Sequence, residues 1–250
     1  QIIGIAKQND CDAIHPGYGF LAENHEFARA CRDANIVFVG PNAHSLKLFG
    51  DKLKARDLAL ANDVPVLPAS YVISGLTIAA EFFESIQPDN NMILKAVAGG
   101  GGKGMRIVRH ESEIEDAWTR GSLEAKEAFG SGDMYAELML ERALHIEVQI
   151  VGDQAGNVRH LGERDCSIQR LHQKVIEVAP SPQLPDTLRD LIHEAAVRVA
   201  SSAQYDNVGT FEFLVDGSDL KDNSDFYFIE ANPRLQVEHT VTEEGTGIDL

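Results

Sequence analysis

The feature that most restricts the fold of this chain is a run of four consecutive glycines between two segments with the pattern of β-strands. The run lies in AVAGGGGKGM (residues 96–105), inside the longer stretch NMILKAVAGGGGKGMRIVR. Glycine loses more conformational freedom on folding than any other residue, so four in succession need a reason. Because a tight hairpin turn needs only two such residues, we interpret the run as a place where a ligand approaches the backbone closely.

Two common nucleotide-binding motifs do not fit this run. Gly99, Gly101 and Gly104 satisfy the spacing G-x-G-x-x-G, but that motif requires a helix directly after it, and the residues that follow alternate like a strand. A P-loop requires glycine at position 97 and a hydroxyl residue at position 104, where this chain has Val97 and Gly104. Neither a Rossmann fingerprint nor a P-loop is therefore indicated.

The interpretation that remains is a hairpin flap whose backbone N–H groups cover a polyphosphate. Lys95 stands just before the flap and Lys103 lies within it, so both can supply positive charge. A plain β-hairpin turn is the simpler alternative.

The order of the elements predicts a mixed α/β and α+β chain. Residues 1–45 have the pattern helix, strand, helix, strand, which is typical of half an open α/β sheet. We expect a helix in GDKLKARDLALAND with Asp51 in its first turn, a short strand in VPVLPAS, and helices over about 76–87, 111–129 and 185–204. The second half is richer in strands: MYAELMLE, HIEVQIV, NVRHLGE, KVIEVAP, GTFEFLV and FYFIEAN. This order predicts more than one subdomain, with a cleft between them.

Composition excludes several classes of function. The chain has 22 Lys and Arg against 39 Asp and Glu, a formal charge of −17, which repels nucleic acid. No stretch approaches the roughly 18 apolar residues that cross a bilayer. Cys11, Cys31 and Cys166 are far apart, so we expect neither disulfides nor a zinc site. This cysteine usage favours an intracellular protein. We expect Cys166 to be a partly buried thiol. Since it begins at Gln1, we expect a piece of a longer protein.

Two strands near the C-terminus carry carboxylates on one face. In GTFEFLV the period of two places Glu212 on the face opposite the phenylalanines, and in FYFIEANPR it places Glu230 and Asn232 together. We expect the two strands to form a hairpin that brings these three side chains side by side. Carboxylate and amide oxygens in this arrangement predict a site for Mg²⁺ or Mn²⁺ shared with phosphates. The alternative is a glutamate directed to solvent at a sheet edge.

The next segment, NPRLQVEH, offers a second set of polar side chains. Arg234, Gln236 and Glu238 alternate and would share one side of an extended chain. A guanidinium can hold a small oxyanion, and a carboxylate can act as a base. We expect His239 to serve in packing or capping.

A polar stretch further upstream, ERDCSIQRLHQKV, concentrates positive charge in an acidic chain. It contains Arg164, Arg170, His172 and Lys174. Local positive charge of this kind predicts a site for an anionic substrate. A solvated charged loop is the alternative.

These motifs together resemble the biotin carboxylase family, which has ATP-grasp architecture. The likeness extends over essentially the whole chain, through IHPGYGFLAEN, FVGPN, GDKLKAR, LKAVAGGGGKGMRIV, HIEVQIVGD, GERDCSIQRLHQKVIEVAP, GTFEFLV and FIEANPRLQVEHTVTEE. The resemblance implies an ATP-grasp domain over residues 51–250, truncated at its C-terminus. It also implies a mobile subdomain with the flap over about 70–140, and the C-terminal part of an open α/β (pre-ATP-grasp) domain over 1–50.

The resemblance also implies three groups of site residues. The ATP-binding residues would be Lys52, Lys95, Gly101, Gly102, Met105, Glu141, Leu144, His145, Gln169, His172 and Leu214. The metal ligands would be Glu212, Glu230 and Asn232, and the bicarbonate site would contain Lys174, Arg234, Gln236, Val237 and Glu238. Lys174, Arg234 and Glu238 would be catalytic, with Glu238 as the general base. Two departures stand out: the segment between Glu141 and His145 is about four residues shorter than usual, and Leu171 stands where a second arginine is common.

The implied function is the first half-reaction of a biotin-dependent carboxylase. ATP would phosphorylate bicarbonate to carboxyphosphate with Mg²⁺ or Mn²⁺, and biotin on a carrier protein would then be carboxylated. The implied partners are a biotin carboxyl carrier domain, a carboxyltransferase and, by analogy, a second copy of the chain. The implied location of the protein is the cytoplasm or the mitochondrial matrix. The alternatives are another ATP-grasp ligase, such as a carbamoyl-phosphate synthetase relative, and a nucleotide-binding domain without catalysis. The residues do not indicate the final carboxyl acceptor.

Overall fold

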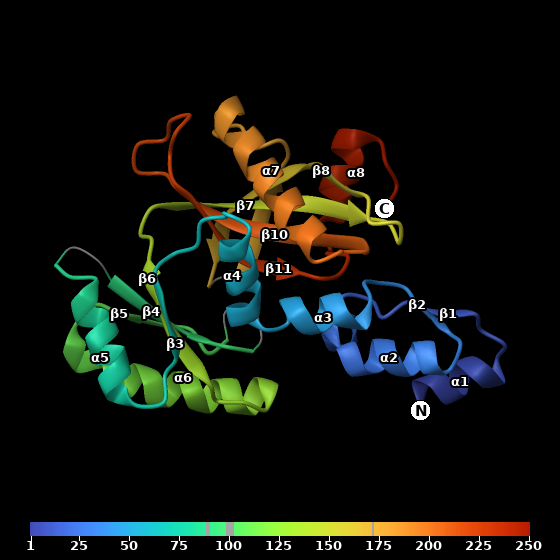
Figure 1. Cartoon of the computed structure of the whole chain (residues 1–250), viewed down its shortest axis with the longest axis horizontal. Helices are drawn as coiled ribbons and strands as arrows, with labels where there is room; N and C mark the ends of the chain where they lie inside the picture. Colours follow the sequence, from blue (N-terminus) through green and yellow to red (C-terminus); the bar gives the residue numbers. More distant parts are fainter. Residues whose placement is uncertain (89–90, 99–102, 172) are drawn as a thin grey trace.

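The computed structural model describes residues 1–88, 91–98, 103–171 and 173–250. These residues form three structural parts (Figure 1): an N-terminal α/β part, a small antiparallel sheet with two helices, and a larger antiparallel sheet. Among the described helices, none combines the length and the apolar character needed to cross a bilayer.

The N-terminal part contains two short parallel strands and three helices. The strands pair Ala13 with Val37 and Ile14 with Phe38. Asn42 caps the last of these helices and also donates from its side chain to the Asp206 carboxylate (2.8 Å), which ties this part to the large sheet. The elements are α1 (Ile2–Gln8), β1 (Ala13–Ile14), the 3₁₀ helix η1 (Phe20–Glu23), α2 (His25–Asp33), β2 (Val37–Phe38) and α3 (Ala43–Phe49). The predicted order of helix, strand, helix, strand is confirmed.

The small sheet has the strand order β3-β6-β4-β5 and is antiparallel. Helices α5 and α6 cover one of its faces and bury Phe83 and Ala125 against Met92 and Met134. Its elements are β3 (Ala69–Val72), α5 (Leu76–Ser85), β4 (Asn91–Ala96), β5 (Arg106–Val108), the 3₁₀ helix η2 (Glu111–Glu113), α6 (Ile114–Phe129) and β6 (Met134–Met139).

The two strands that flank the glycine run, β4 and β5, pair antiparallel, as a hairpin requires. Residues 99–102 lie outside the described part of the chain, so the predicted flap itself is not described. Gly104 has φ +70°, and a Cβ there would come within 3.0 Å of the Ala96 Cβ and 3.2 Å of the Ala125 Cβ. Backbone conformation and close packing therefore both favour glycine at this position.

The large sheet has the strand order β11-β10-β7-β8-β9. Helices α4 and α7 cover one face, and their apolar side chains pack on the alternate residues Ile146, Val148, Phe211 and Phe213. The opposite face carries buried polar side chains, because strand residues alternate between faces. The elements are α4 (Lys52–Ala61), β7 (Ala143–Gly152), β8 (Val158–Arg170), β9 (Gln173–Val178), α7 (Asp186–Ser202), β10 (Asn207–Asp216), β11 (Phe226–Asn232) and α8 (His239–Thr246).

A buried ionic cluster joins β8 to α7 on the apolar side of this sheet. Glu163 accepts from Arg189 Nε (2.8 Å) and the Ser181 N–H (3.0 Å), and lies 2.8 Å from His193 Nε2. Burial alone would raise the pKa of Glu163, but these hydrogen bonds lower it to about 2. The carboxylate is thus kept ionised in a position that is only 2% exposed.

Three sequence expectations about elements are corrected. Asp51 is the N-cap of α4 rather than a residue of its first turn, and its side chain accepts from the Lys54 N–H. VPVLPAS is not a strand over its length: Val66 makes one isolated bridge and β3 begins at Ala69. Its two prolines have no N–H to donate to a ladder. For the polar stretch ERDCSIQRLHQKV, the alternative of a solvated loop is wrong, because most of it belongs to β8 and β9.

Candidate active site

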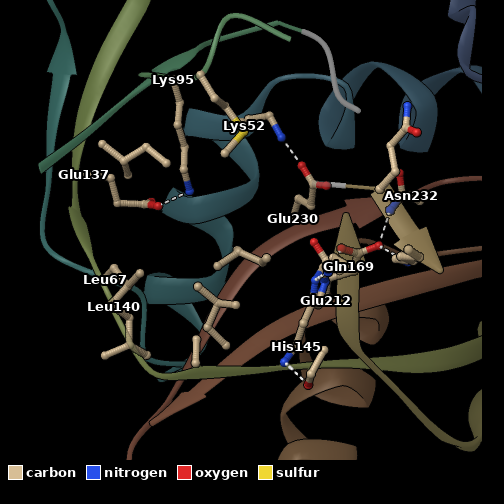
Figure 2. Close-up of a pocket in the computed structure, with 18 of the residues that line it drawn as sticks. Lys52, Leu67, Lys95, Glu137, Leu140, His145, Gln169, Glu212, Glu230 and Asn232 are labelled. Atoms are coloured by element: carbon tan, nitrogen blue, oxygen red, sulfur yellow. Dashed lines mark hydrogen bonds and ion pairs between the residues drawn. The ribbon is translucent and has the colours of Figure 1, made fainter. Parts of the chain in front are cut away.

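A cavity of about 880 Å³ lies between the two sheets. The small sheet contributes Lys95 and Glu137, and the large sheet contributes Glu212 and Glu230 (Figure 2). Helix α4 supplies Lys52 from its first turn. Both acidic and basic side chains therefore converge on one volume from segments far apart in the sequence.

The predicted hairpin of carboxylates is present. Strands β10 and β11 are antiparallel and pair Glu212 with Glu230, and Thr210 with Asn232. Glu212 is 2% exposed and accepts from the Asn232 amide nitrogen at 2.6 Å. Glu230 forms an ion pair with Lys52. All three predicted metal ligands offer oxygen atoms, which are the donors that hard divalent cations such as Mg²⁺ take.

Lys174 and His145 both contact the Glu212 carboxylate. Lys174 Nζ lies 3.1 Å from one carboxylate oxygen, and His145 Nε2 lies 2.6 Å from the other. Burial would raise the pKa of Glu212, but Lys174 and His145 bring it well below its usual range. Gln169 Nε2 lies 2.7 Å from the other ring nitrogen of His145, so this histidine links Gln169, another predicted nucleotide residue, to the acidic hairpin.

Lys52 and Lys95 lie on the opposite side of the cavity. Burial, and then the charge of Lys95, lower the pKa of Lys52 to about 8. Lys95 pairs with Glu137, which is 1% exposed and also accepts from Arg56 Nη1 at 2.8 Å. A single buried carboxylate therefore holds two buried cations.

Glu137 and Leu140 are residues that the sequence analysis missed. Both line the cavity (Figure 2). Glu141 also lines the cavity, but it is exposed and its carboxylate accepts from the Asn91 side chain, and Leu144 packs against the core of the large sheet. Placing the start of this segment at Glu137 rather than Glu141 also restores the four residues that seemed to be lacking before His145.

The residues predicted for the anion site gather at one end of the cavity but not on one extended strand. Arg234 Nε donates to Glu23 of the N-terminal part at 2.6 Å. Gln236 is 3% exposed and accepts from Thr210 Oγ1 at 2.7 Å, whereas Val237 is exposed and Glu238 is the N-cap of α8. The expected shared side of an extended chain is wrong, because the backbone bends at 234 and turns at 237–238.

Lys174 is the centre of this end of the cavity. It pairs with Glu147 and Glu212 and lies 3.3 Å from Glu238 Oε1. Burial would lower the pKa of Lys174, but Glu212 and Glu147 raise it above its ordinary value. Lys174 is therefore a cation throughout the neutral range.

Arg164, from the predicted stretch of positive charge, also lies here, together with Glu147 and Glu177, which were not predicted as site residues. Arg164 is fully buried and donates to Glu147 (2.5 Å) and Gln149 (2.9 Å). One signal was available: in HIEVQIV the alternate residues Glu147 and Gln149 are polar within an otherwise apolar strand, like Glu212 in its own strand.

The other predicted ATP-binding residues divide into two groups. Met105 and Leu214 line the cavity. Gly101, Gly102 and His172 lie outside the described residues.

Cys166 is fully buried and burial raises the pKa of its thiol, as expected of a packing residue.

Two family models match this chain in succession. Residues 1–46 match "Biotin carboxylase, N-terminal domain", and residues 51–250 match "Carbamoyl-phosphate synthase L chain, ATP binding domain". The chain belongs to the biotin carboxylase family. The N-terminal match and the relatives reported below favour this family over carbamoyl-phosphate synthetase.

Curated relatives and solved structures agree with this family. The chain is 55% identical to pyruvate carboxylase of Bacillus subtilis and 50% identical to mitochondrial pyruvate carboxylase of Mus musculus, each match covering 100% of the chain and 21% of the relative. The βγ-ATP complex of Campylobacter jejuni biotin carboxylase superposes with a TM-score of 0.94 at 47% identity, over 99% of this chain and 54% of that one.

A second biotin carboxylase structure was solved with magnesium-ADP and bicarbonate. This biotin carboxylase domain dimer of Hydrogenobacter thermophilus 2-oxoglutarate carboxylase has a TM-score of 0.93 at 43% identity, over 99% of this chain and 53% of that one. The chain thus spans about half of these solved chains and about a fifth of the pyruvate carboxylases.

Proposed function

We propose that this chain carries the ATP- and bicarbonate-binding site of a biotin carboxylase, the ATP-dependent carbon–nitrogen ligase part of a biotin-dependent carboxylase. The observation that carries the proposal is the convergence of an acidic hairpin, two lysines and a buried anion site on one cavity in a biotin carboxylase fold. Two structural relatives were solved with a nucleotide, and one of them with magnesium and bicarbonate as well.

The acidic hairpin is the proposed metal site. Glu212, Glu230 and Asn232 would hold Mg²⁺ or Mn²⁺ through their oxygen atoms. When bound, the metal would offset negative charge on the nucleotide phosphates. Lys52 and Lys95 would bind phosphate oxygens from the other side of the cavity, in place of the carboxylates that they contact now.

For the base of the nucleotide we propose a correction to the set implied by the resemblance. Glu137 and Leu140 would form the adenine-binding segment instead of Glu141 and Leu144, because both of them line the cavity, whereas Glu141 is exposed and Leu144 packs on the core of the large sheet. His145, Gln169, Met105 and Leu214 keep their proposed roles beside the nucleotide, as do Gly101, Gly102 and His172.

The anion end of the cavity is the proposed site of chemistry. Lys174, Arg234, Gln236, Val237 and Glu238 would hold bicarbonate. One bicarbonate oxygen would attack the γ-phosphorus of ATP, the bond from that phosphorus to ADP would break, and Glu238 would take the bicarbonate proton. Holding the two reactants in one cavity supplies the orientation that the reaction needs.

The carboxyphosphate formed would then break down to CO₂ and phosphate. Phosphate would take the proton from the biotin ring nitrogen, and that nitrogen would form its new bond to CO₂. Biotin would arrive on a carrier domain, and a carboxyltransferase would complete the whole protein, which we propose to work in the bacterial cytoplasm or the mitochondrial matrix and as a homodimer of this domain. The curated relatives named above are pyruvate carboxylases, so pyruvate is the first acceptor to test.

The test is ATP turnover by the full-length protein with free biotin, measured with and without bicarbonate. We expect turnover that depends on bicarbonate and is lost in a Glu212→Ala, Glu230→Ala double variant. Turnover that depends on ammonia instead would favour the carbamoyl-phosphate synthetase type of reaction. Nucleotide binding with metal but no turnover under any condition would favour a non-catalytic nucleotide-binding domain.

A further inference from the structure

A buried carboxyl group without a hydrogen-bond partner lies beside the proposed anion site. Glu177, on β9, lines the cavity and is 12% exposed. Its Oε2 is buried and has no hydrogen-bond donor among the residues that the structure describes. The function proposed above gives no role to Glu177.

The lack of a donor follows from how the neighbouring cations are used. Arg164 Nε is 3.6 Å from Glu177 Oε2, too far for a hydrogen bond, and it donates to Glu147 at 2.5 Å. The other donors of Arg164 are directed to Gln149, Thr242 and Gln236. Four of the five N–H donors of Arg164 are thus directed to other groups, and Glu177 has only a 3.6 Å ion-pair contact with Arg164 and no hydrogen bond from it.

The charges around Glu177 also disfavour its ionised form. Burial, then Glu147 and Glu238, raise the pKa of Glu177 to about 7, against the opposing effects of Lys174 and Arg164. The titratable and charged groups that face it are Glu147 on β7, Arg164 and Cys166 on β8, Lys174 on β9, and Glu238 before α8.

A proton explains this cluster better than a metal ion does. Ligand atoms of Glu147, Cys166 and Glu177 lie within 4.8 Å of one another. However, Glu147 already binds both Arg164 and Lys174, and a metal would have to displace them. Protonation of Glu177 removes one negative charge from the cluster without disturbing either ion pair.

We propose that Glu177 is a positioning residue of the anion site: it holds a proton while the anion binds at Lys174, and its ionisation weakens that binding. The inference rests on the proposed function and identifies a group that sets the charge of the same site. An ionised Glu177 adds repulsion for the anion and competes for the charge of Lys174. The coupling is reciprocal, so the bound anion also keeps Glu177 protonated.

The experiment measures the KM for bicarbonate of the full-length enzyme from about pH 6 to about pH 8, which is roughly one pH unit to each side of the pKa of Glu177. Concentrations are those of the bicarbonate ion itself. We expect the wild-type KM to rise by about fivefold or more with pH, and the KM of Glu177→Gln to stay low. Glu244→Gln, which removes an exposed carboxylate from α8, should follow the wild type. A Glu177→Gln profile with the same rise as the wild type overturns the inference.

A second measurement keeps this inference separate from the proposed function. Infrared difference spectroscopy of the full-length protein without substrates should show a protonated carboxyl band that disappears near pH 7 and is missing in Glu177→Gln. Absence of that band from the wild type below pH 7 refutes the inference even where the enzyme is active. Absence of bicarbonate dependence in the wild type, with the band present, refutes the proposed function instead.

Discussion

Replacing Glu137 by glutamine tests the most specific correction that the structure makes to the sequence-based site. Glu137 is 1% exposed and pairs with Arg56 and Lys95, whose side chains are 8% and 14% exposed. Glu137→Gln keeps the shape but leaves two buried cations without their counter-charge. Breaking a buried ion pair in this way costs about 3–5 kcal/mol, which lowers the melting temperature of a domain of this size by about 6–20 °C.

The matched control is Glu141→Gln. Glu141 is exposed and contacts Asn91 only at the surface, so its substitution should change the free energy of unfolding by about 0.5 kcal/mol or less. The assay is differential scanning calorimetry of the full-length protein, following the transition that magnesium-ATP shifts, together with the affinity for ATP. Glu137→Gln should lower both the melting temperature and the affinity, and Glu141→Gln neither. Equal effects of the two substitutions, or a larger effect of Glu141→Gln, would refute the reasoning.

Three further predictions concern other charged and thiol groups. Lys174→Ala and Glu238→Ala should each lower turnover far more than ATP affinity, because both contact the proposed bicarbonate site; an equal loss of ATP binding, measured by calorimetry, would contradict that assignment. Glu163 has its pKa lowered from 4.5 to about 2, so its ionised form contributes about 3 kcal/mol of stability above pH 4.5 that is lost as pH falls towards 2. Glu163→Gln should therefore be less stable than the wild type at pH 7 but nearly equal to it at about pH 2, as measured by denaturant unfolding. A maleimide should label exposed Cys11 rapidly and buried Cys166 only after unfolding, which mass spectrometry of digested protein can verify.

The position of Glu212 in the acidic hairpin could be predicted from sequence because one physical rule decides it. Phe211 and Phe213 must face the core beneath α4 and α7, and the period of two then places Glu212 on the other face. In the partner strand the period of two alone would place Glu230 on the core face with Phe228. A register shift between the pairs Glu212–Glu230 and Phe213–Phe228 moves Glu230 to the face of Glu212, and the sequence pattern does not show this shift.

The parts that could not be predicted depend on contacts between distant segments. Arg234 pairs with Glu23, 211 residues away in the chain, and no local pattern indicates that pair. The sequence pattern alone does not separate Glu137 from Glu141, whereas the structure buries Glu137 in β6 beside the cavity and leaves Glu141 exposed. Likewise, the environment of Glu177 exists only once Glu147, on β7, and Glu238 have folded against it.

The ion pairs in the cavity explain why a metal and a nucleotide would have to bind together. Lys52 is paired with Glu230, and Lys174 with both Glu147 and Glu212. A polyphosphate alone would enter a site whose cations are already neutralised, within a chain of formal charge −17. A divalent cation on Glu212 and Glu230 would take over those carboxylates, release Lys52 for phosphate oxygens, and leave Lys174 paired with Glu147 alone. In this arrangement the acidic hairpin orders the assembly of the site, because the metal frees positive charge on both lysines.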